Sequence, residues 1–127
     1  MKVIYSPNHL EHTPKVEFHE GNKLPHGDNP ERVEKIVERL QRRYEVVRGR
    51  THADFFIKEK QFRGDIVRVH DPAYIDFLER VTHEEHVFRY DFNRDDPSNQ
   101  MTPLSKGTAT AAMYSAYTAL TGAEVAM

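Results

Sequence analysis

A well-delimited amphipathic helix constrains the fold more than any other stretch of this sequence. It is the run DNPERVEKIVERL at residues 28–40. Asn29 is a typical N-cap, and Pro30 suits the first helical position because its missing N–H has no partner there. Apolar residues recur at i, i+3, i+4 and i+7, at Val33, Ile36, Val37 and Leu40. One face of the helix is therefore predicted to pack on a core and the other to face water.

Short β-rich runs flank this helix, at residues 2–5 and 44–47. Each is bounded by polar or turn-forming residues, as is typical of a short strand. The order strand, loop, helix, strand is the first unit of an α/β layer with a right-handed crossover and a parallel sheet.

Two further helices are predicted in the second half of the chain. Asp71 and Pro72 give residues 72–81 the same start signal as the first helix. A segment rich in Ala, Thr and Ser, from residue 104 or 105 to residue 120, suits a helix packed closely on a sheet or another helix. Gly122 is its predicted stop.

The remaining segments show no sustained period. Long loops are predicted at 8–27 and 82–103, and residues 52–63 fit a short helix and an irregular apolar plug about equally. Two parallel strands do not make a stable sheet alone. We therefore expect a single domain, residues 1–127, of the α/β class with an incomplete parallel sheet.

Composition excludes several classes of function. Charged residues make up 30% of the chain and the net charge is −2, so no nucleic-acid surface is indicated. No apolar run approaches the roughly 18 residues that span a bilayer, and the N-terminus is too polar for a signal peptide. We expect a cytoplasmic protein with no membrane partner. The absence of cysteine leaves only histidine and carboxylate as metal ligands.

Eight histidines keep a metal site open as an interpretation. Four of them lie in the first predicted loop: His9, His12, His19 and His26. His83 and His86 are three residues apart with two glutamates between them, whereas the zincin pattern needs histidines at i and i+4. Solvated loop histidines explain both groups, so no metal ligand is assigned and a histidine-based metal binder stays a weaker alternative.

Other catalytic patterns are weak. Asp95 and Asp96 are adjacent, point in different directions in an extended loop and are explained by turn formation, although one of them could accept a hydrogen bond from a substrate N–H. The chain has no G-x-S-x-G elbow, and its six glycines are scattered, so no phosphate loop is present. We assign no catalytic residue.

Three separated motifs carry a family resemblance. They are Val3-Ile-Tyr-Ser-Pro7, then Pro30-Glu31-Arg32 opening a helix, then the string from Val69 to Leu78, VHDPAYIDFL. In order and spacing they resemble the N-terminal third of the histone deacetylase superfamily. Lys15-Val-Glu17, Leu24-Pro25 and Ser105-Lys-Gly107-Thr108 are most similar to its bacterial acetylpolyamine amidohydrolase branch.

The resemblance implies a three-layer α/β/α arginase-deacetylase fold, of which this chain would hold the N-terminal part. It also implies one catalytic zinc held by two Asp and one His, with tandem histidines and a tyrosine as catalytic groups. No Asp-x-His pair and no adjacent histidines occur in the chain. By resemblance, Arg32 and Tyr5 match residues of an internal channel behind the active site, and Asp95 loosely matches a substrate-binding rim aspartate.

Two main functional interpretations follow. In the first, the chain is the N-terminal portion of a zinc-dependent deacylase acting on acetylpolyamines or acetyl-lysine, inactive by itself and needing no cofactor. In the second, it is a non-catalytic scaffold that self-associates through its incomplete sheet, by strand exchange or as a homo-oligomer. Whether this chain is itself an enzyme stays open. For Arg32, surface pairing with Asp28 or Glu31, worth under about 1 kcal/mol, is the alternative to a channel role.

Overall fold

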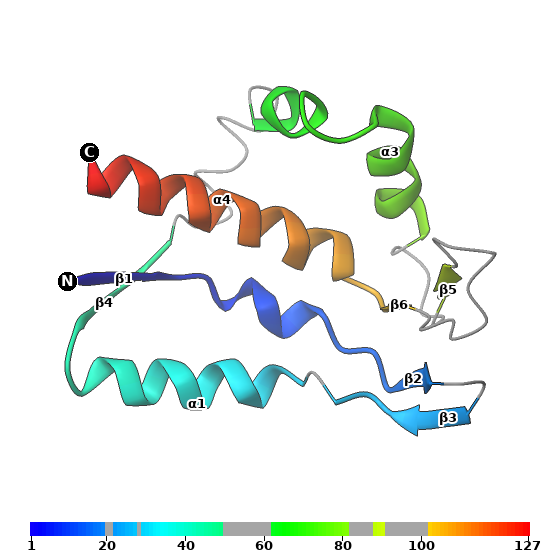
Figure 1. Ribbon diagram of the computed structural model, residues 1–127, viewed down its shortest axis with the longest axis horizontal. Helices are drawn as coiled ribbons and strands as arrows, with labels where there is room; N and C mark the ends of the chain where they lie inside the picture. The colour runs from blue at the N-terminus through cyan, green and yellow to red at the C-terminus, as the bar shows by residue number, and fades with distance from the viewer. Residues whose placement is uncertain (20–21, 28, 50–61, 82–87, 91–101) are drawn as a thin grey trace.

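The chain folds around a short parallel strand pair with a helix on each face (Figure 1). The computed structural model describes residues 1–19, 22–27, 29–49, 62–81, 88–90 and 102–127. The elements are, in chain order, β1 (Lys2–Tyr5), the 3-10 helix η1 (Pro7–Glu11), β2 (Val16–His19), β3 (Asn22–Pro25), α1 (Pro30–Gln41), β4 (Glu45–Arg48), α3 (Pro72–Val81), β5 (Phe88–Tyr90), β6 (Thr102–Leu104) and α4 (Thr108–Ala126). Residues 62–67 are also helical.

The predicted strand–helix–strand unit is confirmed. β1 and β4 pair in parallel, with Val3 opposite Val46, and α1 connects them. α4 packs on β1 and α1 packs on β4, so the strands lie between two helices. A parallel pair needs both faces covered, and this arrangement gives the mixed α/β architecture that the sequence predicts.

α1 begins where the sequence predicts. The Asn29 side chain accepts a hydrogen bond from the backbone N–H of Arg32 at 3.3 Å, and Pro30 occupies the first helical position. The helix ends at a C-cap residue, Arg42, close to the predicted end. Its apolar face is only half-covered, because α1 contains no buried residue.

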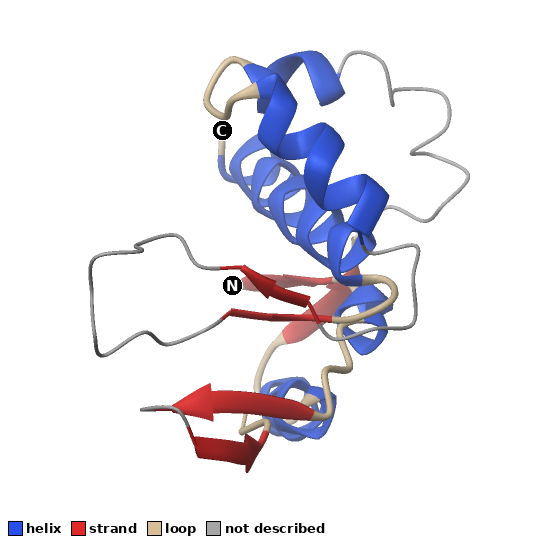
Figure 2. Cartoon of the chain, turned by 90° about the vertical axis from the view of Figure 1, so that its right-hand side faces the viewer, coloured by secondary structure: helices blue, strands red, loops and turns tan. Residues whose placement is uncertain are grey.

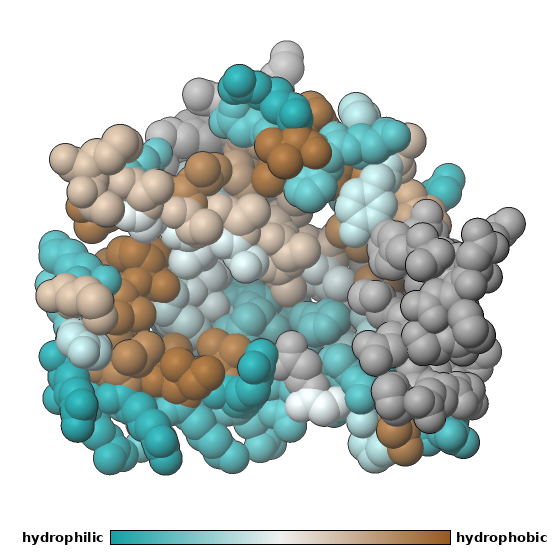
Figure 3. All heavy atoms as spheres, in the orientation of Figure 1, coloured by the Kyte–Doolittle hydropathy of each residue, from teal (hydrophilic) through white to brown (hydrophobic). Residues whose placement is uncertain are grey.

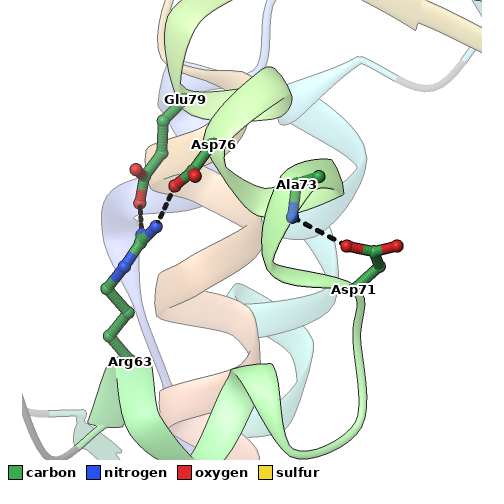
Figure 4. Close-up of polar contacts among 5 residues, drawn as sticks. All are labelled: Arg63, Asp71, Ala73, Asp76 and Glu79. Carbon is green, nitrogen blue, oxygen red and sulfur yellow. Dashed lines mark hydrogen bonds and ion pairs between the residues drawn. The ribbon is translucent and has the colours of Figure 1, made fainter.

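Residues 62–67 and α3 form a second helical layer. Asp71 starts α3, since its carboxylate accepts the backbone N–H of Ala73 at 2.8 Å. Arg63 donates to the carboxylates of Asp76 and Glu79 and thereby connects the two segments (Figure 4). In Figure 2 these helices and α4 lie on one side of the strands and α1 lies on the other.

The core is formed by α4 and the elements packed beside it. Its buried apolar residues are Phe62, Ile75, Leu104, Ala109, Tyr114 and Tyr117. The rings of Phe62 and Tyr117 meet edge to face with centroids 5.0 Å apart, a favourable aromatic geometry. None of these residues belongs to β1, β4 or α1, so the core of the described residues lies on the α4 side of the strands.

The structure corrects the predictions of two long loops. Residues 8–27, expected to be one long loop, contain most of η1 and the β2–β3 hairpin, in which Glu17 pairs with Leu24. Within 82–103, β5 and part of β6 pair antiparallel, and the rest lies outside the described residues, as do residues 52–61. Short polar strands carry little periodicity, which is why they escape pattern analysis.

The predicted stop at Gly122 is wrong, because α4 continues through it to Ala126. Glycine ends a helix when its backbone turns left-handed, and among the described glycines only Gly107 has a positive φ, at 88°. Gly107 instead precedes α4 as its N-cap residue.

Candidate functional site

A cavity of about 290 Å³ lies between η1, the start of α1 and the start of α4. Its lining residues are His9, His12, Asn29, Pro30, Arg32, Val33, Thr108, Ala111 and Ala112. Small residues on α4 leave room for it, and the polar side chains that line it are a guanidinium, two imidazoles, a hydroxyl and an amide.

The two imidazoles are positioned by η1. Residues i and i+3 of a 3-10 helix lie on the same side, so His9 and His12 both reach the cavity. The Nδ1–H of His9 donates to the backbone carbonyl of Ser6 at 3.0 Å, because a carbonyl can only accept. His9 also packs on Tyr5, with ring centroids 5.5 Å apart. This contact connects β1 with the cavity wall.

A buried hydrogen-bond network fixes the α4 side of the cavity. The Thr108 hydroxyl lies 2.9 Å from Nδ1 of His12 and accepts the backbone N–H of Ser105 at 2.8 Å. The Ser105 hydroxyl accepts the backbone N–H of Thr13 at 2.9 Å. Ser105 and Thr108 are each 8% exposed, and their hydroxyls satisfy the buried backbone N–H of Ser105 and the part-buried N–H of Thr13.

A third imidazole stands behind the cavity. His26 donates from Nδ1 to the Glu17 carboxylate at 2.9 Å, and its side chain is 9% exposed. Its ring meets that of His12 edge to face with centroids 5.7 Å apart. The hairpin that carries Glu17 and His26 is thereby attached to the cavity wall through His12.

Only some of the predicted site residues lie at this cavity. Arg32 lines it, and Tyr5 does not line it but packs on His9, which does. Asp95 lies outside the described residues, as do His83 and His86. Sequence reasoning missed the pairing of His12 with Thr108, although both stand in segments that it singled out, because residues 96 positions apart give no local signal.

The histidines do not assemble a metal centre in the part of the chain that is described. No three His, Cys, Asp or Glu side chains there are grouped so that they could hold a metal ion. The described helices likewise include none that is long and apolar enough to cross a membrane.

Comparison with known proteins decides the family. The sequence profile of the histone deacetylase domain matches residues 26–127. The chain belongs to the histone deacetylase family. A search among curated proteins returns no match. The predicted resemblance is confirmed at this level, and the family region includes α1 with Arg32, α3 and α4.

A solved relative shows how much of the family fold is present. The crystal structure of acetylpolyamine aminohydrolase from Burkholderia pseudomallei superposes with a TM-score of 0.72 at 22% identity. The match covers 94% of this chain and 39% of that chain. This histone deacetylase family chain therefore has part of the deacetylase fold and spans well under half the length of that relative.

Proposed function

We propose that this chain is the N-terminal portion of a zinc-dependent deacylase that hydrolyses acetyl amides of polyamines or acetyl-lysine. The observation that supports it is the profile match over residues 26–127 together with the partial superposition on an acetylpolyamine aminohydrolase. We also propose that the chain is inactive by itself.

The chemistry of the cavity favours binding of a small ligand by its lining residues over catalysis by them. Arg32 contributes a permanent cation beside two imidazoles and a hydroxyl, a set that favours a small carboxylate over a cation. In a complete enzyme, Arg32 and Tyr5 would line an internal channel that holds acetate or water. Asp95 would belong to the substrate rim, outside the described residues.

The described residues do not fit the zinc that the family implies, since no suitable ligand group is found among them. We therefore assign no metal ligand here and derive no step through the metal. Within this proposal the described residues shape and support a site whose reacting groups they do not include.

A deacetylation assay with added zinc tests the inactivity of the chain. The substrates are an acetylated polyamine and an acetyl-lysine peptide, and the acetylpolyamine aminohydrolase of Burkholderia pseudomallei serves as the active control. We expect no chelator-sensitive turnover by the chain. Turnover that disappears with a chelator would contradict the proposal.

An NMR titration with sodium acetate tests the channel role of Arg32. We expect shift changes at His9, His12 and Thr108 that disappear in Arg32→Gln. Arg39→Gln is the matched control, because Arg39 lies on the same helix but does not line this cavity. Equal responses of the two variants would contradict the assignment of Arg32.

The second candidate function is a self-associating, non-catalytic scaffold. It is supported by the incomplete burial of the β1–β4 layer, whose strand residues are half-buried or exposed. Figure 3 shows hydrophobic side chains gathered between α4 and α1 on one face of the molecule. Exposed apolar surface of this kind is typical of an association site.

A further inference from the structure

The tautomer of His9 is fixed by the residue that caps its own 3-10 helix. Nδ1 of His9 carries a proton, because it donates to the backbone carbonyl of Ser6 at 3.0 Å. In the neutral ring Nε2 therefore keeps a free lone pair. This nitrogen is buried and has no hydrogen-bond partner among the described residues. His9 thus offers a basic nitrogen that the described part of the fold does not use.

The cavity that His9 lines has positive charge and no carboxylate on its described wall. Arg32 of α1 supplies the permanent cation. Glu11, which shares η1 with His9, is not in this wall, because it accepts from the Asn8 amide at 2.7 Å and lies against Gly107. Further titratable groups around η1 are Tyr5 of β1, His12 at its end, Tyr114 of α4 and, behind His12, Glu17 and His26 of the β2–β3 hairpin. A carboxylate bound in the cavity would bring the negative charge that this wall lacks.

We propose that the cavity binds a carboxylate together with a proton, and that His9 takes up this proton on Nε2. The proton comes from the solvent, and no bond of the ligand changes. The carboxylate balances the charge of Arg32, and a nearby negative charge also favours the imidazolium form of a histidine. An imidazolium charge is shared over the whole ring, so it acts at the cavity wall although Nε2 itself is buried. The inference rests on the proposed function, in which Arg32 lines a channel for acetate, and adds the regulation of that channel by pH.

The coupling predicts tighter binding at low pH. Histidine is the side chain that changes charge between pH 5 and 8. Above this range the anion meets a neutral His9, whereas below it the ring is already charged when the anion arrives. Lowering the pH from about 8 to about 5.5 should therefore reduce the dissociation constant of acetate about three- to tenfold. The channel of a complete enzyme would accordingly retain its acid product more tightly as the pH falls.

Acetate titrations of the full chain at both pH values, followed by NMR at constant ionic strength, test the coupling. Sodium formate is the second probe, because formic acid is the stronger acid and stays ionised over this range. An equal ratio of dissociation constants with formate shows that the proton is taken up by the protein and not by the ligand. Calorimetry in two buffers of different protonation enthalpy should show a net uptake of part of a proton for each acetate bound.

His9→Gln tests the assignment to His9, because a glutamine amide can still donate a hydrogen bond but takes up no proton. We expect the ratio of the two dissociation constants to fall to about one in this variant. His70→Gln is the matched control, since His70 is exposed and does not line the cavity, and it should keep the full ratio. If His9→Gln does not fold, the Cε1 resonance of His9 in the unchanged chain serves instead. Its titration midpoint should rise by about 0.5 to 1 pH unit with saturating acetate.

A dissociation constant that does not depend on pH, or a His9 midpoint that acetate leaves in place, would overturn the inference. So would a pH dependence that survives His9→Gln or disappears only in His12→Gln, because the proton would then lie elsewhere. These results leave the channel role of Arg32 intact, since acetate still binds. A chain that binds neither acetate nor formate would overturn both the inference and that channel role. The deacetylation assay tests the inactivity of the chain separately.

Discussion

Nδ1 of His12 lies 2.9 Å from the hydroxyl of Thr108, although the two residues are 96 positions apart. This bond joins the end of η1 to the first residue of α4 and closes one side of the cavity. Because Thr108 also accepts the N–H of Ser105, one hydroxyl holds the turn that leads into α4 and joins it to the end of η1.

Replacing Thr108 with valine should therefore destabilise the chain. The buried N–H of Ser105 would lose its acceptor and the His12 imidazole its bond to this hydroxyl, at a cost of about 1–3 kcal/mol in the free energy of unfolding. Thr121→Val is the matched control, because the Thr121 hydroxyl only caps the carbonyl of Tyr117 in its own helix, at 3.0 Å. Urea unfolding measures both variants, and equal costs would argue against a structural role for the network.

Gly107→Ala should be more costly than a surface substitution. The backbone of Gly107 has φ of 88°, and an added Cβ would lie 2.8 Å from Cβ and the carbonyl oxygen of Glu11. Backbone strain and this overlap predict a loss of about 2 kcal/mol or more.

Gly122→Ala, within α4, should have the opposite effect and stabilise the chain. Apart from its chain neighbours and the backbone of its own helix, no atom lies within 4 Å of its Cβ position, so helix propensity predicts a gain of about 0.5–1 kcal/mol. Thermal unfolding of the two glycine variants side by side would expose an error if Gly107→Ala were neutral or Gly122→Ala destabilising.

Arg63→Gln should loosen residues 62–67 from α3. Arg63 bridges Asp76 and Glu79 with a side chain that is 34% exposed, so solvent screens the pair and the expected loss is at most about 1 kcal/mol, smaller at high salt. The control is Arg42→Gln, which breaks a more exposed i, i+4 pair with Glu38. Urea denaturation of both variants at low and high salt measures their losses in the free energy of unfolding. A loss in Arg63→Gln that does not depend on salt would contradict an ionic origin.

Stability should fall at high pH because of Tyr114. Burial, followed by the negative charge of Glu11, raises the pKa of Tyr114 above its ordinary value of 10.0. The folded chain therefore keeps this proton when the unfolded chain releases it, and stability present below about pH 10 declines as pH rises further. Tyr114→Phe should flatten that decline in the measured free energy of unfolding, whereas an unchanged slope would implicate other groups.

The local signals in the sequence were reliable where the chain determines its own conformation. Asn29 and Pro30 define the start of α1, and Asp71 and Pro72 that of α3, because caps and proline geometry act within one turn. The apolar runs of β1 and β4 likewise indicated strands, and the order of elements implied their parallel pairing. Family membership was also readable, since its motifs are contiguous strings.

Tertiary structure decided what depends on distant neighbours. The hairpin of Glu17 and Leu24 has too few residues to show a period, and Gly122 continues α4 because nothing turns its backbone left-handed. Only folding brings Arg32, His12 and Thr108 to one cavity, since each comes from a different element. Sequence thus determined the elements by local backbone preference, whereas the site arose from packing between segments far apart in the chain.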